Sequence, residues 1–335
     1  MSHSFIDRSS NYFTQNYDNE ETQKKIDPIA QLKEINNTTV REWGLFNNPS
    51  VQMYPIDSDT ESKILSESAQ QDDNPLSSNN QDFFTNVKTY IDEQVKIYND
   101  KISDLEAEYK KKNWAIDKTK GNFKNYLDRI TLLDGYKEKI ESIETEAKSK
   151  GAHGDDLLTL MNIVHNEAAN YGDKAKLAVA YAYLNRIKYM GDGNIREPEN
   201  DQEISHYSEL NDRWKGFTTT AEKLEFLKNI KDSFDAAKTR FDADGKTDPT
   251  KGATHWVSPI GLESASGSDD KKSGYYPRNY PGVGWKFFPN WARSNDWVKE
   301  NPKEAGKWFN VSEYEEITAA GVDGKEFLFY KGVKY

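Results

Sequence analysis

Glu167 is a candidate for chemistry, because it stands at the end of an apolar helical run that begins near Leu157. The alternative is that it is a solvated charge or a capping partner, as a Glu at the end of a helix usually is. Residues 170–172 (NYG) end this run, and an alanine-rich helix that a neighbour can approach closely is expected over residues 174–188. A carboxyl group at this junction would be partly desolvated, which disfavours its charged form and raises its pKa. Such a group can hold a proton near neutral pH and donate it to the oxygen of a departing sugar.

Four segments of the C-terminal half follow one another in an order similar to that of a known enzyme family. They are residues 163–169 with 178–187 (IVHNEAA and AVAYAYLNRI), 248–259 (DPTKGATHWVSP), 289–294 (PNWARS) and 324–330 (GKEFLFY). In this order they resemble the spore cortex-lytic (SleB-type) cell wall hydrolases. The resemblance covers only the C-terminal half and does not extend to residues 1–150.

The resemblance implies a lysozyme-like α+β domain over residues 151–335 that cleaves peptidoglycan between N-acetylmuramic acid and N-acetylglucosamine. Glu167 falls on the family's catalytic acid, and the family typically acts by lytic transglycosylation, which leaves a 1,6-anhydromuramic acid end. One carboxyl group suffices for this reaction, because the attacking hydroxyl belongs to the same sugar. Hydrolysis by a muramidase stays open, and it needs a second carboxylate, for which the candidates are Asp201, Glu203, Glu209 and Asp212.

Further residues are predicted to bind substrate or to support the site. Tyr207 and Ser208 take the place of an aromatic-Ser pair that lines the family's cleft. The predicted substrate-binding set is Tyr207, Ser208, Thr254, His255, Trp256, Tyr276 and Trp291. Asn185 and Arg186 are expected to hold their helix against the loops of the site.

The chain also departs from the family's pattern. Residues 169–172 (ANYG) replace an Arg-Gly-Glu-like continuation, so a second acidic group near Glu167 is missing. Residues 274–285 (GYYPRNYPGVGW) lie in a longer segment than expected, which forms either a cleft wall that stacks on sugars or an aromatic loop that packs on its own domain. His165 and Glu167 point in different directions on a helix, and no HExxH spacing occurs, so we expect no metal and no cofactor.

The sequence pattern of the N-terminal half indicates a structural or docking role rather than a catalytic one. Residues 1–80 form a polar arm that is expected to be flexible or to dock. From residue 82 apolar residues recur every seven positions as in a coiled coil, at Phe84, Ile91, Tyr98 and Leu105. A second series holds the offset position, at Val95, Ile102 and Tyr109, with Lys88 as its polar exception. A second periodic run follows Gly121, so residues 81–150 are predicted to form a helical hairpin that serves as a spacer or a pairing surface.

Composition narrows the classes of function and the setting. The net charge of −11 and the lack of a basic stripe argue against nucleic acid, and the absence of cysteine excludes disulfides and thiolate metal sites. No signal peptide or membrane span is expected. We therefore expect synthesis in the cytoplasm and action in the periplasm or cell wall after lysis or machine-mediated delivery, as for a phage lysin or a type VI secretion effector.

Partners follow from this setting. Residues 1–150 would suit a carrier or spike protein, and an immunity protein would accompany an antibacterial effector. The alternative from another class is a non-catalytic, glycan-binding structural component of a phage tail or injection machine.

Overall fold

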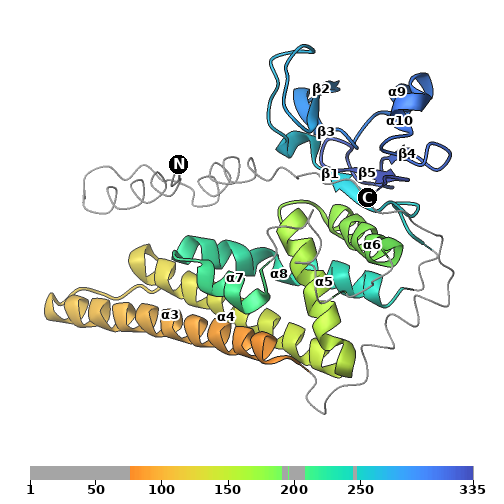
Figure 1. Cartoon of the computed structure of the whole chain (residues 1–335). Coiled ribbons are helices and arrows are strands. Elements are labelled where there is room, and N and C mark those ends of the chain that lie inside the picture. Colours follow the sequence, from red (N-terminus) through yellow and green to blue (C-terminus); the bar gives the residue numbers. More distant parts are fainter. Residues whose placement is uncertain (1–75, 191–194, 196–207, 244–246, 335) are drawn as a thin grey trace, which may run out of the picture. The chain divides into compact units, whose positions relative to one another are not determined.

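The computed structural model describes residues 76–190, 195, 208–243 and 247–334, so the predicted polar arm lies almost wholly outside the described residues. The larger helices are α3 (Ser78–Lys111), α4 (Gly121–Ser149), α5 (Gly154–Ala168), α6 (Asp173–Met190), α7 (Leu210–Gly216) and α8 (Thr220–Phe241) (Figure 1). The remaining elements are β1 (His255–Val257), β2 (Tyr275–Tyr280), β3 (Gly284–Pro289), α9 (Asn295–Glu300), α10 (Pro302–Ala305), β4 (Glu315–Ile317) and β5 (Leu328–Lys331). The predicted α+β class is confirmed at this level: the described part is mostly helical, with small antiparallel sheets.

The helices α3 and α4 pack against each other along the predicted apolar seam (Figure 1). Phe84 and Ile91 of α3 are fully buried there. The polar exception Lys88 pairs with Glu144 of α4, with 2.7 Å between Nζ and Oε2. The helix α4 ends at Ser149, and a single 3-10 turn, Gly151–His153, leads into α5.

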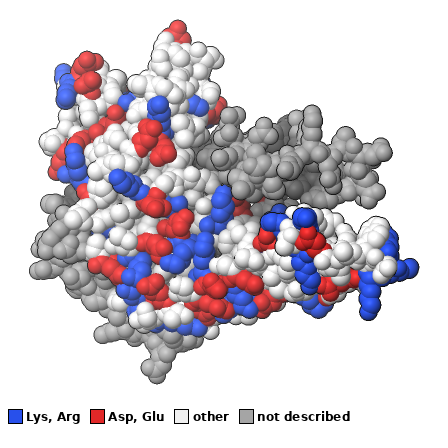
Figure 2. All heavy atoms as spheres, turned by 180° about the vertical axis from the view of Figure 1, so that it is seen from behind, with Lys and Arg blue, Asp and Glu red and all other residues white. Residues whose placement is uncertain are grey.

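The exposed faces of the hairpin carry many ion pairs between residues four apart, such as Lys96 with Asp100 and Lys112 with Glu108. Figure 2 shows acidic and basic side chains interspersed over the face that it presents. Each exposed pair of this kind stabilises a helix by only about 0.2–0.5 kcal/mol. No helix among the described residues is long and apolar enough to cross a membrane.

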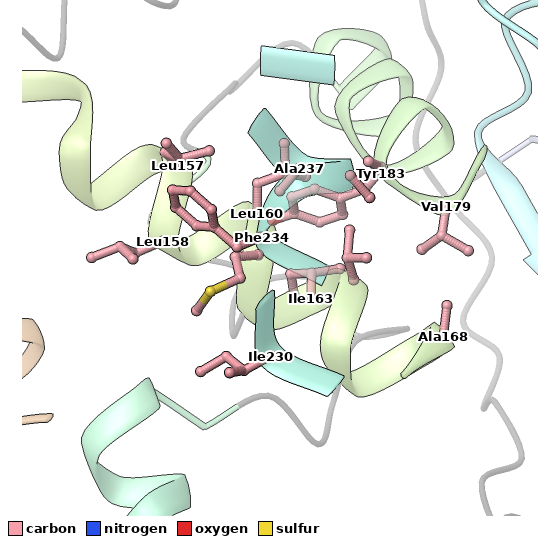
Figure 3. Packing of buried hydrophobic residues seen from close by; sticks show 14 of the residues in the cluster. Leu157, Leu158, Leu160, Ile163, Ala168, Val179, Tyr183, Ile230, Phe234 and Ala237 are labelled. Carbon is pink, nitrogen blue, oxygen red and sulfur yellow. The ribbon is translucent and has the colours of Figure 1, made fainter. Parts of the chain in front are cut away.

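The helix α5 is the centre of the main core. Every residue from Leu157 to His165 is buried, because α6 and α8 both pack on this helix. Figure 3 shows Val179 and Tyr183 of α6 and Phe234 of α8 around its apolar side chains. The apolar run that the sequence indicated is therefore buried on nearly all sides of the helix.

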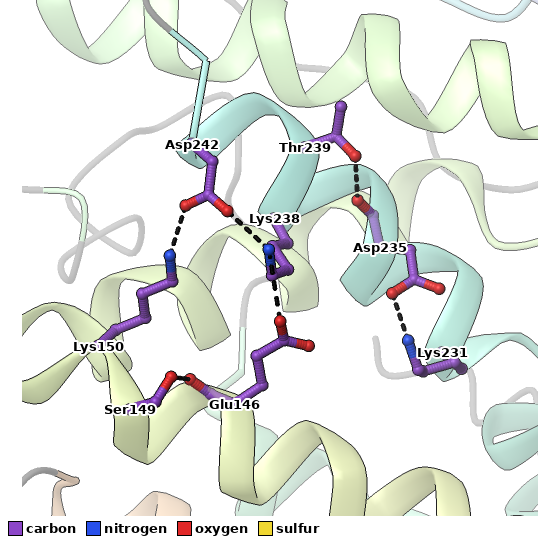
Figure 4. A network of polar contacts seen from close by, with 8 residues as sticks. All are labelled: Glu146, Ser149, Lys150, Lys231, Asp235, Lys238, Thr239 and Asp242. Atoms are coloured by element: carbon purple, nitrogen blue, oxygen red, sulfur yellow. Dashed lines mark hydrogen bonds and ion pairs between the residues drawn. The ribbon is translucent and has the colours of Figure 1, made fainter.

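The same core includes the hairpin. The ring of Phe83 in α3 lies 6.5 Å from that of Trp214 in α7 and 6.0 Å from that of Phe226 in α8. A polar network joins the ends of α4 and α8 at the surface, where Lys238 contacts Glu146 at 3.3 Å and Asp242 at 2.7 Å (Figure 4). The hairpin is therefore packed on the helices that follow it.

The three-stranded antiparallel sheet has the order β1-β5-β4 and separates two hydrophobic clusters. Neighbouring side chains of a strand point to opposite faces. Trp256 of β1 pairs with Phe329 of β5, and both belong to the helical core. Val257 and its partner Leu328 belong to the second cluster.

The strands β2 and β3 form the aromatic segment that the sequence left open between two interpretations. Tyr276 and Tyr280 of β2 pack on the second cluster, and Phe288 of β3 is fully buried in it. Arg278 of β2 donates two hydrogen bonds to the carboxylate of Glu316 in β4. The segment therefore packs on its own domain.

Candidate active site

Glu167 lies in the last turn of α5 and is half-buried. Its Oε2 accepts a hydrogen bond from the indole Nε1 of Trp256 at 3.2 Å, and its Oε1 accepts one from Nδ2 of Asn166 at 3.4 Å. Trp256 is buried and lies in β1, 89 positions along the chain. The end of α5 and the strand β1 thus meet at this carboxyl group.

Burial raises the pKa of the Glu167 carboxyl above its ordinary value. The hydrogen bonds from Trp256 and Asn166 and the positive charges of Arg213 and Arg186 lower the pKa, but they do not cancel the effect of burial. A carboxyl group that keeps its proton at a higher pH than an exposed glutamate is suited to general acid catalysis.

A loop organised by Asp248 delivers Trp256 to this position. Oδ1 of Asp248 accepts hydrogen bonds from the backbone N and from Oγ1 of Thr250, both at 2.7 Å. Its Oδ2 accepts one from the backbone N of Gly252, also at 2.7 Å. Gly252 has a φ of +84°, a left-handed conformation that glycine adopts without steric cost. These contacts explain why an Asp, a Thr and a Gly stand at these spacings.

Asn185 joins the helix α6 to the same loop. Its Nδ2 lies 2.8 Å from Oδ2 of Asp248 and 3.1 Å from the carbonyl oxygen of Ala253. The next residue, Arg186, is buried, and its positive charge acts on Glu167. Asn185 therefore fixes the loop that precedes β1, and Arg186 acts on the carboxyl group electrostatically.

Tyr171 and Ser258 are neighbours of this site that sequence reasoning did not single out. The Tyr171 hydroxyl lies 2.9 Å from Oγ of Ser258, and Tyr171 and Glu167 interact electrostatically. Their positions carried a signal, because Tyr171 follows Glu167 by four residues and Ser258 follows Trp256 by two. Glu167 in the last turn of α5 and Tyr171 in the turn that follows thus meet Trp256 and Ser258, two residues from one side of the β1 segment.

No family model matches this chain. Searches of the curated proteins and of the solved structures find no similar protein either. The resemblance to cell wall hydrolases therefore rests on the four sequence segments, and the site rests on the contacts above.

Three predicted substrate-binding residues, His255, Tyr276 and Trp291, lie in or against the second cluster, on the other face of the sheet from Trp256. The buried His255 ring is 5.0 Å from the Trp291 ring, and its Nδ1 is 2.9 Å from Oγ1 of the buried Thr254. The Tyr276 hydroxyl donates to the carbonyl oxygen of Ala292. The structure thus brings Trp256 to Glu167, and it does not bring these three residues there.

The segment before α7 is only partly described. Tyr207, Asp201 and Glu203 lie outside the described residues. Ser208 is exposed, and its carbonyl oxygen accepts a hydrogen bond from Nδ2 of Asn162 in α5 at 2.9 Å. The other two candidates for a second carboxylate, Glu209 and Asp212, are exposed at the start of α7.

His165 points away from Glu167. Its Nε2 lies 3.1 Å from the carbonyl oxygen of Phe226 in α8, and burial holds the pKa of this imidazole well below its ordinary value. His165 is therefore neutral at physiological pH. Within the ranges that the structure describes, no group of three or more His, Asp and Glu residues could hold a metal ion.

Proposed function

We propose that this protein cleaves the glycan strands of peptidoglycan between N-acetylmuramic acid and N-acetylglucosamine, with Glu167 as the proton donor. The observation that carries the proposal is the half-buried Glu167 carboxyl, whose pKa burial raises and whose Oε2 is held by the Trp256 indole. The substrate class comes from the four segments that resemble the SleB-type cell wall hydrolases. A lysozyme-like arrangement of residues 151–335 belongs to the same proposal.

Lytic transglycosylation suits a site with one such carboxyl group. Protonated Glu167 donates its proton to the bridging oxygen, which leaves with the released sugar as a hydroxyl group. The muramic C6 hydroxyl then attacks the oxocarbenium-like C1 of its own ring, and its proton passes to the Glu167 carboxylate. The 1,6-anhydro ring is formed and the acid is regenerated, so neither water nor a second carboxylate takes part. The hydrogen bond from Trp256 stabilises the carboxylate between the two proton transfers.

Digestion of purified peptidoglycan, followed by mass spectrometry of the fragments, tests the proposal. Anhydro-ended fragments identify a transglycosylase, reducing ends identify a muramidase, and intact sacculi identify a non-catalytic glycan-binding component. Glu167→Gln keeps the shape of the side chain but removes the acid, so we expect cleavage to fall by about 10²–10⁴-fold. Glu93→Gln, at an exposed position of α3, is the matched control and should cleave like the wild type. Retained cleavage by the Glu167→Gln protein would rule out this acid.

The proposed activity also sets where the protein would act. Peptidoglycan is reached from the periplasm or from outside the cell, so a phage lysin released by lysis and an injected antibacterial effector are both compatible settings. For an effector, a carrier that binds residues 1–150 and an immunity protein that covers Glu167 are the expected partners.

A further inference from the structure

Two hydrogen bonds run side by side at the junction of α5 and β1. Glu167 bonds to Trp256, and Tyr171, four residues later, bonds to Ser258, two residues beyond Trp256. Ser258 continues the extended backbone of β1, so its side chain lies on the same side as that of Trp256. The hydroxyl pair of Tyr171 and Ser258 is therefore a direct neighbour of the Glu167 carboxyl group along both segments.

The hydroxyl pair has one hydrogen that the protein does not use. Each hydroxyl carries one hydrogen, and the contact of 2.9 Å between them consumes only one of the two. In the described part of the chain, neither hydroxyl has another hydrogen-bond partner. Both residues are also partly exposed, so the second hydrogen can be donated to a bound molecule.

The pair is held in place before any ligand arrives. The Tyr171 ring packs edge-on against Phe327, with 4.7 Å between ring centroids, and the Tyr171 carbonyl oxygen accepts a hydrogen bond from Nζ of Lys176 at 2.7 Å. Burial, together with the negative charges of Glu326 and Glu167, raises the pKa of the Tyr171 phenol, although the hydrogen bond with Ser258 lowers it. The phenol therefore keeps its proton and remains a donor over the range in which proteins are folded.

We infer that the hydroxyl pair of Tyr171 and Ser258 is a substrate-binding site, which donates a hydrogen bond to an accepting oxygen of the sugar beside the bond that Glu167 cleaves. This inference rests on the proposed function for its ligand, a glycan strand. It adds two residues in contact with substrate that neither the predicted substrate-binding set nor the contacts of Glu167 include.

The test uses the full chain with Tyr171→Phe and Ser258→Ala, alone and together. For binding, each is combined with Glu167→Gln and titrated with soluble, uncross-linked glycan strands, with tryptophan fluorescence as the readout. Each substitution removes either the donating hydroxyl or the internal contact that orients it, so binding should weaken about three- to tenfold. In proteins that retain Glu167, KM for cleavage should rise by a similar factor, with kcat and the pH dependence little changed. The double variant should be no weaker than the weaker single variant, because the two hydroxyls act as a unit.

Tyr275→Phe, which removes the hydroxyl of a half-buried tyrosine in β2, is the matched control and should bind like its parent. Wild-type binding and KM in Tyr171→Phe and Ser258→Ala would overturn the inference. A lower melting temperature without weaker binding would overturn it too, because the pair would then only stabilise the fold. If the hydroxyl variants bind normally while the wild-type protein cleaves and Glu167→Gln does not, the inference fails and the proposed function stands. If wild-type protein leaves sacculi intact while the hydroxyl variants still lose affinity, the proposed function fails and the binding site stands. Absence of any binding to strands overturns both.

Discussion

Two opposing effects act on the proton of Glu167. Burial at the end of α5 disfavours the carboxylate, and the indole N–H of Trp256 stabilises it. The sequence predicted the first effect, because the apolar run before Glu167 and the alanine-rich run after it already indicate a packed junction. It could not predict the second, because the two partners are 89 residues apart and β1 is too short for a periodic pattern.

Trp256→Phe tests this balance at the residue scale. The substitution removes the N–H that favours the charged form, so the pKa of Glu167 should rise further. A general acid loses activity as the pH rises through its pKa, and therefore the alkaline limb of kcat/KM should move to higher pH, by about one unit. The pH profile of peptidoglycan cleavage measures this shift.

Trp291→Phe is the control, because Trp291 is an equally buried tryptophan on the other face of the sheet. Its alkaline limb should coincide with that of the wild type. A shift of the Trp256→Phe limb toward lower pH would contradict the role given to the indole.

Among the elements, the sequence predicted the long helices more fully than the short strands. The helix predicted over residues 174–188 is α6, which runs from Asp173 to Met190. The start of α8 is fixed by a capping box in which Thr219 Oγ1 accepts from the backbone N of Glu222 at 3.2 Å. By contrast, the sequence did not predict β2 and β3. Their segment contains Pro277, Pro281 and several glycines, and its pairing depends on contacts with the second cluster.

The loop between α8 and β1 gives a prediction at the scale of the element. Gly252→Ala adds a Cβ that meets no atom within 4 Å, so its cost comes only from the φ of +84°. We expect the free energy of unfolding to fall by about 1 kcal/mol. Cleavage should weaken as well, because this loop positions Trp256.

Gly267→Ala is the matched control, since its Cβ also meets nothing and its φ is not in the left-handed region. Urea unfolding of both variants measures the difference. Equal stability of the two would show that the loop conformation is not under the strain assigned to it.

The hydrophobic core of the described part of the chain is more continuous than the sequence suggests. A boundary was expected between residues 150 and 151, and the helices do break there, yet one hydrophobic cluster extends from Leu76 before α3 to Phe329 in β5. Heptad spacing identifies which residues of a helix are buried, but it does not identify their partner. It therefore could not reveal that Phe83 packs on α7 and α8.

This continuity predicts one cooperative unfolding transition for the hairpin and the domain that follows. Ile140→Ala, at a fully buried position of α4, should lower the free energy of unfolding by about 2–5 kcal/mol. The loss should appear equally in helical circular dichroism and in tryptophan fluorescence.

Ile97→Ala in α3 is the control, since this side chain is 43% exposed, and we expect almost no change. Two separate transitions, with the hairpin melting first, would instead mean that it is an independent unit.

The register of β1 against β5 decides which side chain meets Glu167. A shift of one residue would turn the indole of Trp256 toward the second cluster and leave Glu167 facing a different side chain. A shift of two residues would keep the indole on the helical side but move it about 7 Å along the strand, beyond the reach of the carboxyl group. Descendants of this sequence can therefore change the length of the connection between Asp248 and Trp256 only where the loop before β1 absorbs the change and leaves this pairing in place.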